Sequence, residues 1–214
     1  MGSKYFFSVI VPLSILLPIT IGSIKLRTLP GTARIVLWYL FFSAVINAAA
    51  IIVGRYFHQN NLPLVHLFTV IEAILFIWYY QKLHGVSKNN LFYVLVAAAF
   101  TILCIINAIF FQSIYTYSSY SRSLEAIVCM LFALNYFAKL ASATSEKKTS
   151  TQPDFYFSAG IFLYFSGAFI LFVFSNFIIT NLSGHDYLII WTIHAALLLL
   201  MYVFFSIAFL LCKK

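Results

Sequence analysis

Three ionisable residues stand inside long apolar runs of the 214-residue sequence and are the best candidates for chemistry. Glu72, Glu125 and His194 each take the second position of a similar pentad, namely IEAIL, LEAIV and IHAAL. Carboxylate and imidazole groups transfer protons, accept hydrogen bonds and bind cations. An ionisable group inside a bilayer costs at least about 2.5–3.5 kcal/mol, so each side chain is expected to face other helices and to have a partner there.

The candidate partners of these residues differ. Arg122 precedes Glu125 by three residues, which places both on one face of a helix and predicts an ion pair near the outer interface. A purely structural role is the simplest interpretation of that pair. Glu72 has no charged residue one turn away on its own helix, so its partner must come from another helix. His194 and Asn107, at similar depth, are the predicted partners.

The three pentads belong to a longer pattern. An asparagine precedes each one, by twenty-five residues in the first case and by eighteen in the other two. The pattern indicates one lead helix followed by three similar helical hairpins, although apolar segments built from few residue types also match one another by chance. We expect the polar residues to converge on one cavity that opens outward. The predicted ligand-binding residues are Glu72, Glu125, His194, Arg122, Asn107, Asn176, Asn47 and His66.

A metal site is the main alternative use of these groups. Imidazole and carboxylate both suit zinc, and His66, His185 and Asp186 add donors toward the outer surface. His185 and His194 lie nine residues apart, however, and therefore on opposite faces of a helix. Because no pair shows a helical metal spacing, we predict no metal site and leave the cofactor open.

The elements that position these residues follow from the composition. The chain is 63% hydrophobic and 8% charged, whereas a soluble domain carries about a quarter charged residues. Too little polar surface is available to cover a globule in water, so most of the protein surface must face the lipid bilayer. The net charge of +8 does not indicate nucleic acid, because excess Lys and Arg is typical of cytoplasmic loops in membrane proteins.

The sequence predicts an all-α polytopic membrane protein of seven transmembrane helices in a single domain. A helix needs about 20 mostly apolar residues to cross the hydrocarbon. The weakest of the predicted breaks separates the fourth and fifth spans, because Ser113–Ser121 is polar only through Ser and Tyr. The predicted spans are Tyr5–Ile24, Ile35–Gly54, Leu62–Gln81, Leu91–Gln112, Ser118–Leu140, Phe155–Thr180 and Asp186–Leu211.

The distribution of basic residues predicts the orientation. Ten of the 13 Lys and Arg residues fall on one side of these spans, and the other side holds Lys4, Arg55 and Arg122. The richer side is expected to be cytoplasmic, which places the N-terminus outside and the C-terminus in the cytoplasm of a multi-pass protein of the cell membrane. Tyr79, Tyr80 and other aromatic residues near span ends are expected to form an interfacial belt.

The function classes follow from this set of residues. No Gly-rich phosphate loop, serine nucleophile elbow or paired-cysteine motif occurs in the sequence. We therefore expect a receptor-like or sensor-like protein that binds a small or lipidic ligand in an outward-facing polar cavity and relays to a separate cytoplasmic protein. A small proton-coupled transporter is one alternative. A metal-dependent membrane hydrolase that uses Glu72, Glu125 and His194 is the other.

Overall fold

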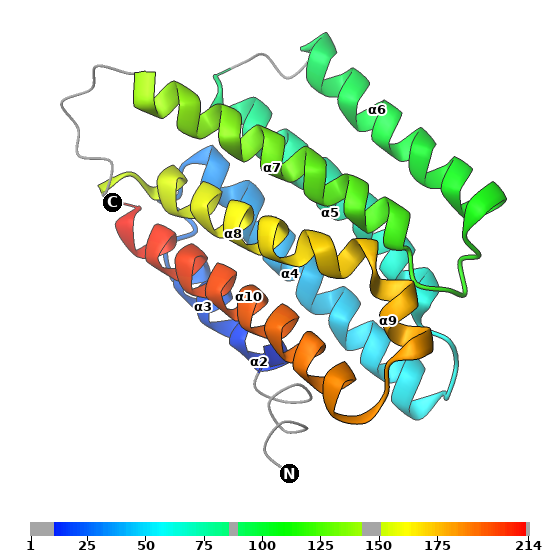
Figure 1. Ribbon diagram of the computed structural model, residues 1–214. Helices are drawn as coiled ribbons and strands as arrows, with labels where there is room; N and C mark the ends of the chain where they lie inside the picture. The colour runs from blue at the N-terminus through cyan, green and yellow to red at the C-terminus, as the bar shows by residue number, and fades with distance from the viewer. Residues whose placement is uncertain (1–10, 86–89, 143–150, 213–214) are drawn as a thin grey trace.

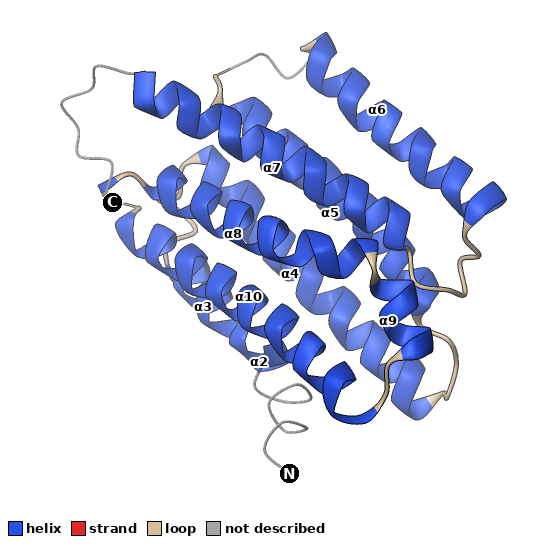
Figure 2. Cartoon of the chain, in the orientation of Figure 1, coloured by secondary structure: helices blue, strands red, loops and turns tan. Residues whose placement is uncertain are grey.

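The computed structural model describes residues 11–85, 90–142 and 151–212, and all regular structure in this part of the chain is helical (Figure 2). Six helices are long and apolar enough to cross a membrane, so the protein is a multi-pass membrane protein. They are α4 (Gly31–Ile51, continued by the π-helical segment Ile52–Tyr56), α5 (Leu62–Leu83), α6 (Leu91–Ile106, continued by the π-helical segment Asn107–Phe111), α7 (Ser119–Ser142), α8 (Pro153–Val173) and α10 (Gly184–Leu211).

Three shorter helices complete the described chain. α2 (Val11–Ser14) and α3 (Leu16–Ile24) form one apolar segment that is shorter than the other six. This segment covers the second part of the predicted first span, whose beginning at Tyr5 lies outside the described residues. α9 (Ser175–Asn181) connects α8 to the last helix.

The helix bounds differ most from the prediction in the sixth span. That span was expected to run to Thr180, but α8 ends at Val173 and the chain turns at Phe174 into α9 (Figure 1). The Ser175 hydroxyl donates to the Phe172 carbonyl at 2.8 Å, so a side chain occupies one of the acceptors that helix ends leave free. The predicted break between the fourth and fifth spans is confirmed, since α6 with its π-helical segment and α7 are separate.

The core is built largely from aromatic side chains. Phe76 of α5 meets Phe165 of α8 with ring centroids 5.8 Å apart, and Phe157 meets Phe205 of α10 at 5.5 Å. α8 and α10 approach closely at Gly160, where a Cβ atom would lie 3.0 Å from the Phe204 Cβ. α6 stands apart at the edge of the bundle (Figure 1), and many of its apolar side chains are exposed, as expected for a helix that faces lipid.

The two ends of the bundle differ in their content of basic residues. The "basic end" contains the ends of α3, α5 and α7 and the start of α4, with Lys25, Arg27, Arg34, Lys82 and Lys139. The "α9 end" contains α9 and the connections at 57–61, 112–118 and 182–183. Tyr79 and Tyr80 are fully buried in the core, so the prediction that these two belong to an interfacial belt is wrong.

Candidate functional site

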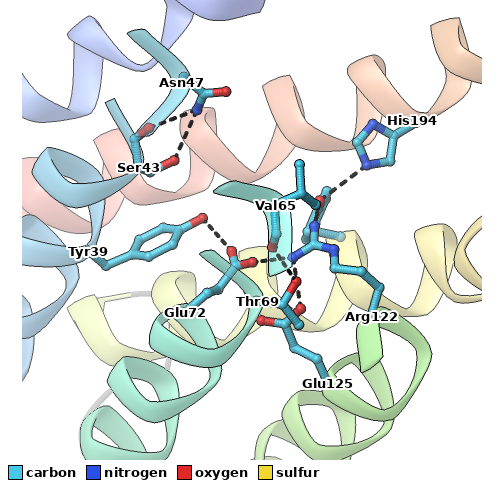
Figure 3. Close-up of polar contacts among 10 residues, drawn as sticks. Tyr39, Ser43, Asn47, Val65, Thr69, Glu72, Arg122, Glu125 and His194 are labelled. Carbon is cyan, nitrogen blue, oxygen red and sulfur yellow. Dashed lines mark hydrogen bonds and ion pairs between the residues drawn. The ribbon is translucent and has the colours of Figure 1, made fainter. Parts of the chain in front are cut away.

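Arg122 is the centre of a buried ion cluster at the α9 end. Its Nη1 donates to Glu125 Oε2 at 2.8 Å and to Glu72 Oε2 at 2.5 Å (Figure 3). The predicted pair between Arg122 and Glu125 is confirmed, but it is buried. Glu72 does take its ionic partner from another helix, as expected, but that partner is Arg122. The prediction that His194 or Asn107 is the partner of Glu72 is wrong, because the Arg122 side chain lies between the packed helices α5 and α7.

The cluster continues as a chain of hydrogen bonds across the bundle. The Tyr39 hydroxyl donates to Glu72 Oε1 at 2.9 Å, and Arg122 Nη2 donates to the Tyr164 hydroxyl at 3.3 Å. The Tyr164 hydroxyl in turn lies 3.2 Å from His194 Nε2. These five residues belong to five different helices: α4, α5, α7, α8 and α10. Polar contacts therefore tie most of the bundle together through one arginine.

Aromatic rings enclose the guanidinium group. Its central carbon lies 4.6 Å from the centroid of Phe172 and 5.7 Å from that of Phe68, within the range of cation–π attraction. Glu72 and Arg122 are 1% and 6% exposed, and Glu125 is fully buried. Charges so far from solvent depend on each other, because removal of one partner leaves an uncompensated buried charge that costs about 3–5 kcal/mol.

A cavity of about 230 Å³ borders the cluster. Glu72, Arg122 and His194 line it, as predicted, whereas Glu125 does not line it and pairs with Arg122. Asn47 also lines the cavity, and its exposed side chain donates to the Ser43 carbonyl at 2.9 Å. The remaining lining residues are Tyr39, Ser43, Val65, Phe68, Tyr117, Tyr164, Trp191, Leu198 and Tyr202.

Two of the predicted asparagines lie elsewhere, which corrects the expectation that all three line the cavity. Asn107 Nδ2 donates to Gln112 Oε1 and to Ser121 Oγ, both at 3.1 Å. Asn176 Nδ2 donates to Ser119 Oγ at 3.0 Å. Both amides are directed to the first turn of α7, three residues or fewer from Arg122. Their role in the structure is to hold that turn, and they support the cluster from outside the cavity.

His66 is also absent from the cavity. Its Nε2 lies 3.0 Å from the Thr116 carbonyl oxygen, so it links the start of α5 to the connection before α7. Tyr117, in the same connection, does line the cavity. Burial raises the pKa of the Tyr117 hydroxyl above its ordinary value, and the nearby Arg122 opposes that change. The hydroxyl is therefore protonated at neutral pH.

Sequence reasoning missed the tyrosines of the site. Tyr39, Tyr164 and Tyr202 stand well inside α4, α8 and α10, away from both helix ends. A buried tyrosine hydroxyl needs a hydrogen-bond partner, so a tyrosine at mid-span is a signal of a polar interior. The prediction considered only tyrosines near span ends, where an aromatic belt explains them.

The described residues contain no group of three His, Cys, Asp or Glu side chains placed to hold a metal ion. The Arg122 guanidinium instead occupies the position between the two carboxylates. Comparisons with protein-family models, with curated proteins and with solved structures find no match for the chain. The cavity and its ion cluster are therefore the features of this protein that bear on function.

Proposed function

We propose that this protein is a seven-span membrane sensor that binds a small polar ligand in the cavity beside Glu72, Arg122 and His194. The observation that carries the proposal is the hydrogen-bond chain from Tyr39 to His194, which borders the cavity and joins five helices. A ligand that competes for any bond of this chain acts on all five helices. Such a response is what a receptor needs to report binding at a distance.

The proposed topology places the α9 end outside and the basic end in the cytoplasm. The proposed first span contains α2 and α3, and α3 packs against α4 and α10. Among the described residues, Arg55 is the exposed basic side chain at the α9 end, since Arg122 is buried in the cluster. The excess of basic residues at the other end favours a cytoplasmic position.

The proposed signal runs along the helices from the cavity to the basic end. α7 carries Arg122 in its first turn and reaches the basic end at Ser142, while α10 carries His194 and ends near Lys25. A ligand that changes the contacts of Arg122 and His194 shifts these two helices relative to α8, which packs against both. A separate cytoplasmic protein then recognises the altered basic end.

The test uses a matched pair of tryptophan substitutions on α4. Asn47→Trp fills the edge of the cavity, whereas Val45→Trp places the same bulk on a side chain that is 64% exposed and faces lipid. Thermal stability of the purified proteins is measured against a panel of amino acids, amines, carboxylates and sugars. We expect one class to stabilise the wild type and Val45→Trp but not Asn47→Trp. Equal stabilisation of all three proteins would place binding outside the cavity.

A proton-coupled carrier is the second candidate, and one observation favours it. A continuous hydrogen-bond chain runs from Glu72 through Arg122 and Tyr164 to His194, and its two ends, Glu72 and His194, are groups that can take up and release protons. Transporters use such chains of intramembrane acids and histidines as proton relays. Uptake into liposomes that depends on a proton gradient supports the carrier, while binding without any flux supports the sensor.

A further inference from the structure

The cavity contains hydrogen-bond donors that the protein itself leaves unused. Trp191 Nε1 and Arg122 Nε are both buried and have no hydrogen-bond partner. Both side chains line the cavity, and Arg122 is more than nine-tenths buried. Indole and guanidinium nitrogens donate only. Because a buried donor without a partner is unfavourable, the missing group is an acceptor supplied by what binds there.

The charge of the site restricts which acceptor fits. One carboxylate is enough to balance Arg122, and the second leaves the cluster neutral or negative according to whether it carries a proton. A ligand that carries only negative charge therefore finds no uncompensated positive charge in the cluster, even though Arg122 attracts its acceptor oxygens. A carboxylate is therefore favoured only when the same molecule brings a positive charge.

The cavity has a place for that positive charge. Glu72 Oε1 accepts one hydrogen bond, from Tyr39, and a carboxylate oxygen can accept two. Glu72 lines the cavity, so the free position on this oxygen is available to a bound molecule. An ammonium group next to Glu72 thus gains a charged acceptor.

We infer that the ligand is a small zwitterion of the amino-acid type, whose carboxylate meets Trp191 Nε1 and Arg122 Nε and whose ammonium group meets Glu72. This inference rests on the proposed binding function of the cavity. The volume of about 230 Å³ lies below the usual range of roughly 300–1,000 Å³ for ligand pockets, which favours a molecule of this small size.

The experiment compares three molecules that share the 3-methylbutyl chain: leucine, 3-methylbutylamine and 4-methylpentanoate. The first carries both charges, the second only the positive one and the third only the negative one. Glycine and phenylalanine extend the size range of the zwitterion. Binding to the purified full chain is measured by titration calorimetry and by thermal shift. We expect at least one zwitterion to bind about tenfold or more tighter than either singly charged analogue.

Two substitutions assign the contacts. Trp191→Phe removes the donor and keeps a ring, so it weakens binding of the zwitterion about tenfold and leaves binding of the amine unchanged. Trp78→Phe, on a side chain outside the cavity, is the control and has no effect. Glu72→Gln weakens both the zwitterion and the amine, because both present an ammonium group to this position.

The outcomes separate this inference from the proposed function. Any one of three results overturns the proposal of a zwitterionic ligand. These are tighter binding of the amine or of the carboxylate, no binding by any member of the series, and an unchanged affinity for the zwitterion in Trp191→Phe. If a sugar or another class of molecule stabilises the wild type but not Asn47→Trp, the proposed function of the cavity stands and only the ligand class is wrong. If a zwitterion binds but Asn47→Trp does not affect it, the proposed site itself fails.

Discussion

Polar residues gather at two levels of the bundle, and α5 contributes to both. Glu72 belongs to the ion cluster toward the α9 end, whereas Tyr79, seven residues or about 10 Å further along the helix, belongs to a second cluster toward the basic end. In the second cluster the Tyr79 hydroxyl donates to Asp154 Oδ1 at 3.3 Å, and the hydroxyls of Tyr80 and Tyr136 are buried without a hydrogen-bond partner.

The two clusters differ in charge and in surroundings. The first contains paired charges beside a cavity, while the hydroxyls of the second lie within stacked aromatic rings. Tyr80 stacks on Phe132 with centroids 5.6 Å apart, and Tyr79 meets the edge of Phe157 at 6.2 Å. A cluster beside open space has room to rearrange, whereas one inside tight packing does not. The proposed ligand response therefore belongs to the first cluster, and we propose a supporting role for the second.

The largest expected effect is the loss of the cation at the centre of the first cluster. Arg122→Met leaves two buried carboxylates without their partner and should destabilise the protein by about 3–5 kcal/mol. The triple variant Arg122→Met, Glu72→Gln, Glu125→Gln removes all three charges and should recover part of that stability. Denaturation of the purified proteins in detergent measures both. Equal stability of the single and triple variants would show that the charges do not depend on one another.

A smaller change tests which cluster responds to ligand. Glu72→Gln keeps the shape of the side chain and loses its charge, so the variant should fold but lose binding in the thermal-shift assay. Asp154→Asn is the matched change in the second cluster, and it should lower stability without altering the affinity. Loss of binding in both variants, or only in Asp154→Asn, contradicts the division between the clusters.

Within the second cluster, two neighbouring tyrosines should respond differently to the same change. Tyr79→Phe removes a hydroxyl that is hydrogen-bonded to Asp154 and should cost about 0.5–1.5 kcal/mol. Tyr80→Phe removes a hydroxyl that has no partner and should be neutral or stabilising, because its burial is not compensated. Melting temperatures of the two variants and the wild type decide the matter, and an equal loss in both would refute the assignment.

The smallest effect concerns pH at the basic end. His84 follows α5, and its Nδ1 lies 2.5 Å from the Tyr93 hydroxyl. Burial, and to a lesser extent Lys139, lower the pKa of His84 below its ordinary value of 6.5. The neutral form of His84 is thus favoured in the folded protein. The contribution of His84 to stability is therefore complete above about pH 6.5 and is lost as the pH falls toward the lower pKa of the folded state.

Melting temperatures between pH 7 and pH 5 measure this effect. The wild type should lose slightly more stability on acidification than His84→Gln, which has no imidazole to protonate. Parallel curves for the two proteins would mean that His84 does not contribute.

Much of the site could be expected from the sequence because charge is costly in a bilayer. Glu72, Glu125, Arg122 and His194 had to face inward, and three of the four line one cavity while Glu125 pairs with the arginine between the carboxylates. The supporting amides were harder to place. Asn107 was expected in the cavity, but α6, whose π-helical continuation begins at Asn107, stands at the edge of the bundle (Figure 1) and contributes no lining residue.

The composition and the spacing of polar breaks by themselves determined that the chain forms apolar helices in a membrane, because backbone groups in lipid must bond within their own segment. They also determined which few residues had to be paired. Only the tertiary structure decided that Arg122 bridges two acids, that Tyr39 and Tyr164 complete the chain, and that α8 stops at Val173. The physical reason is that these helices are apolar on nearly every face, so hydropathy places a residue at a depth but does not say toward which neighbour it points.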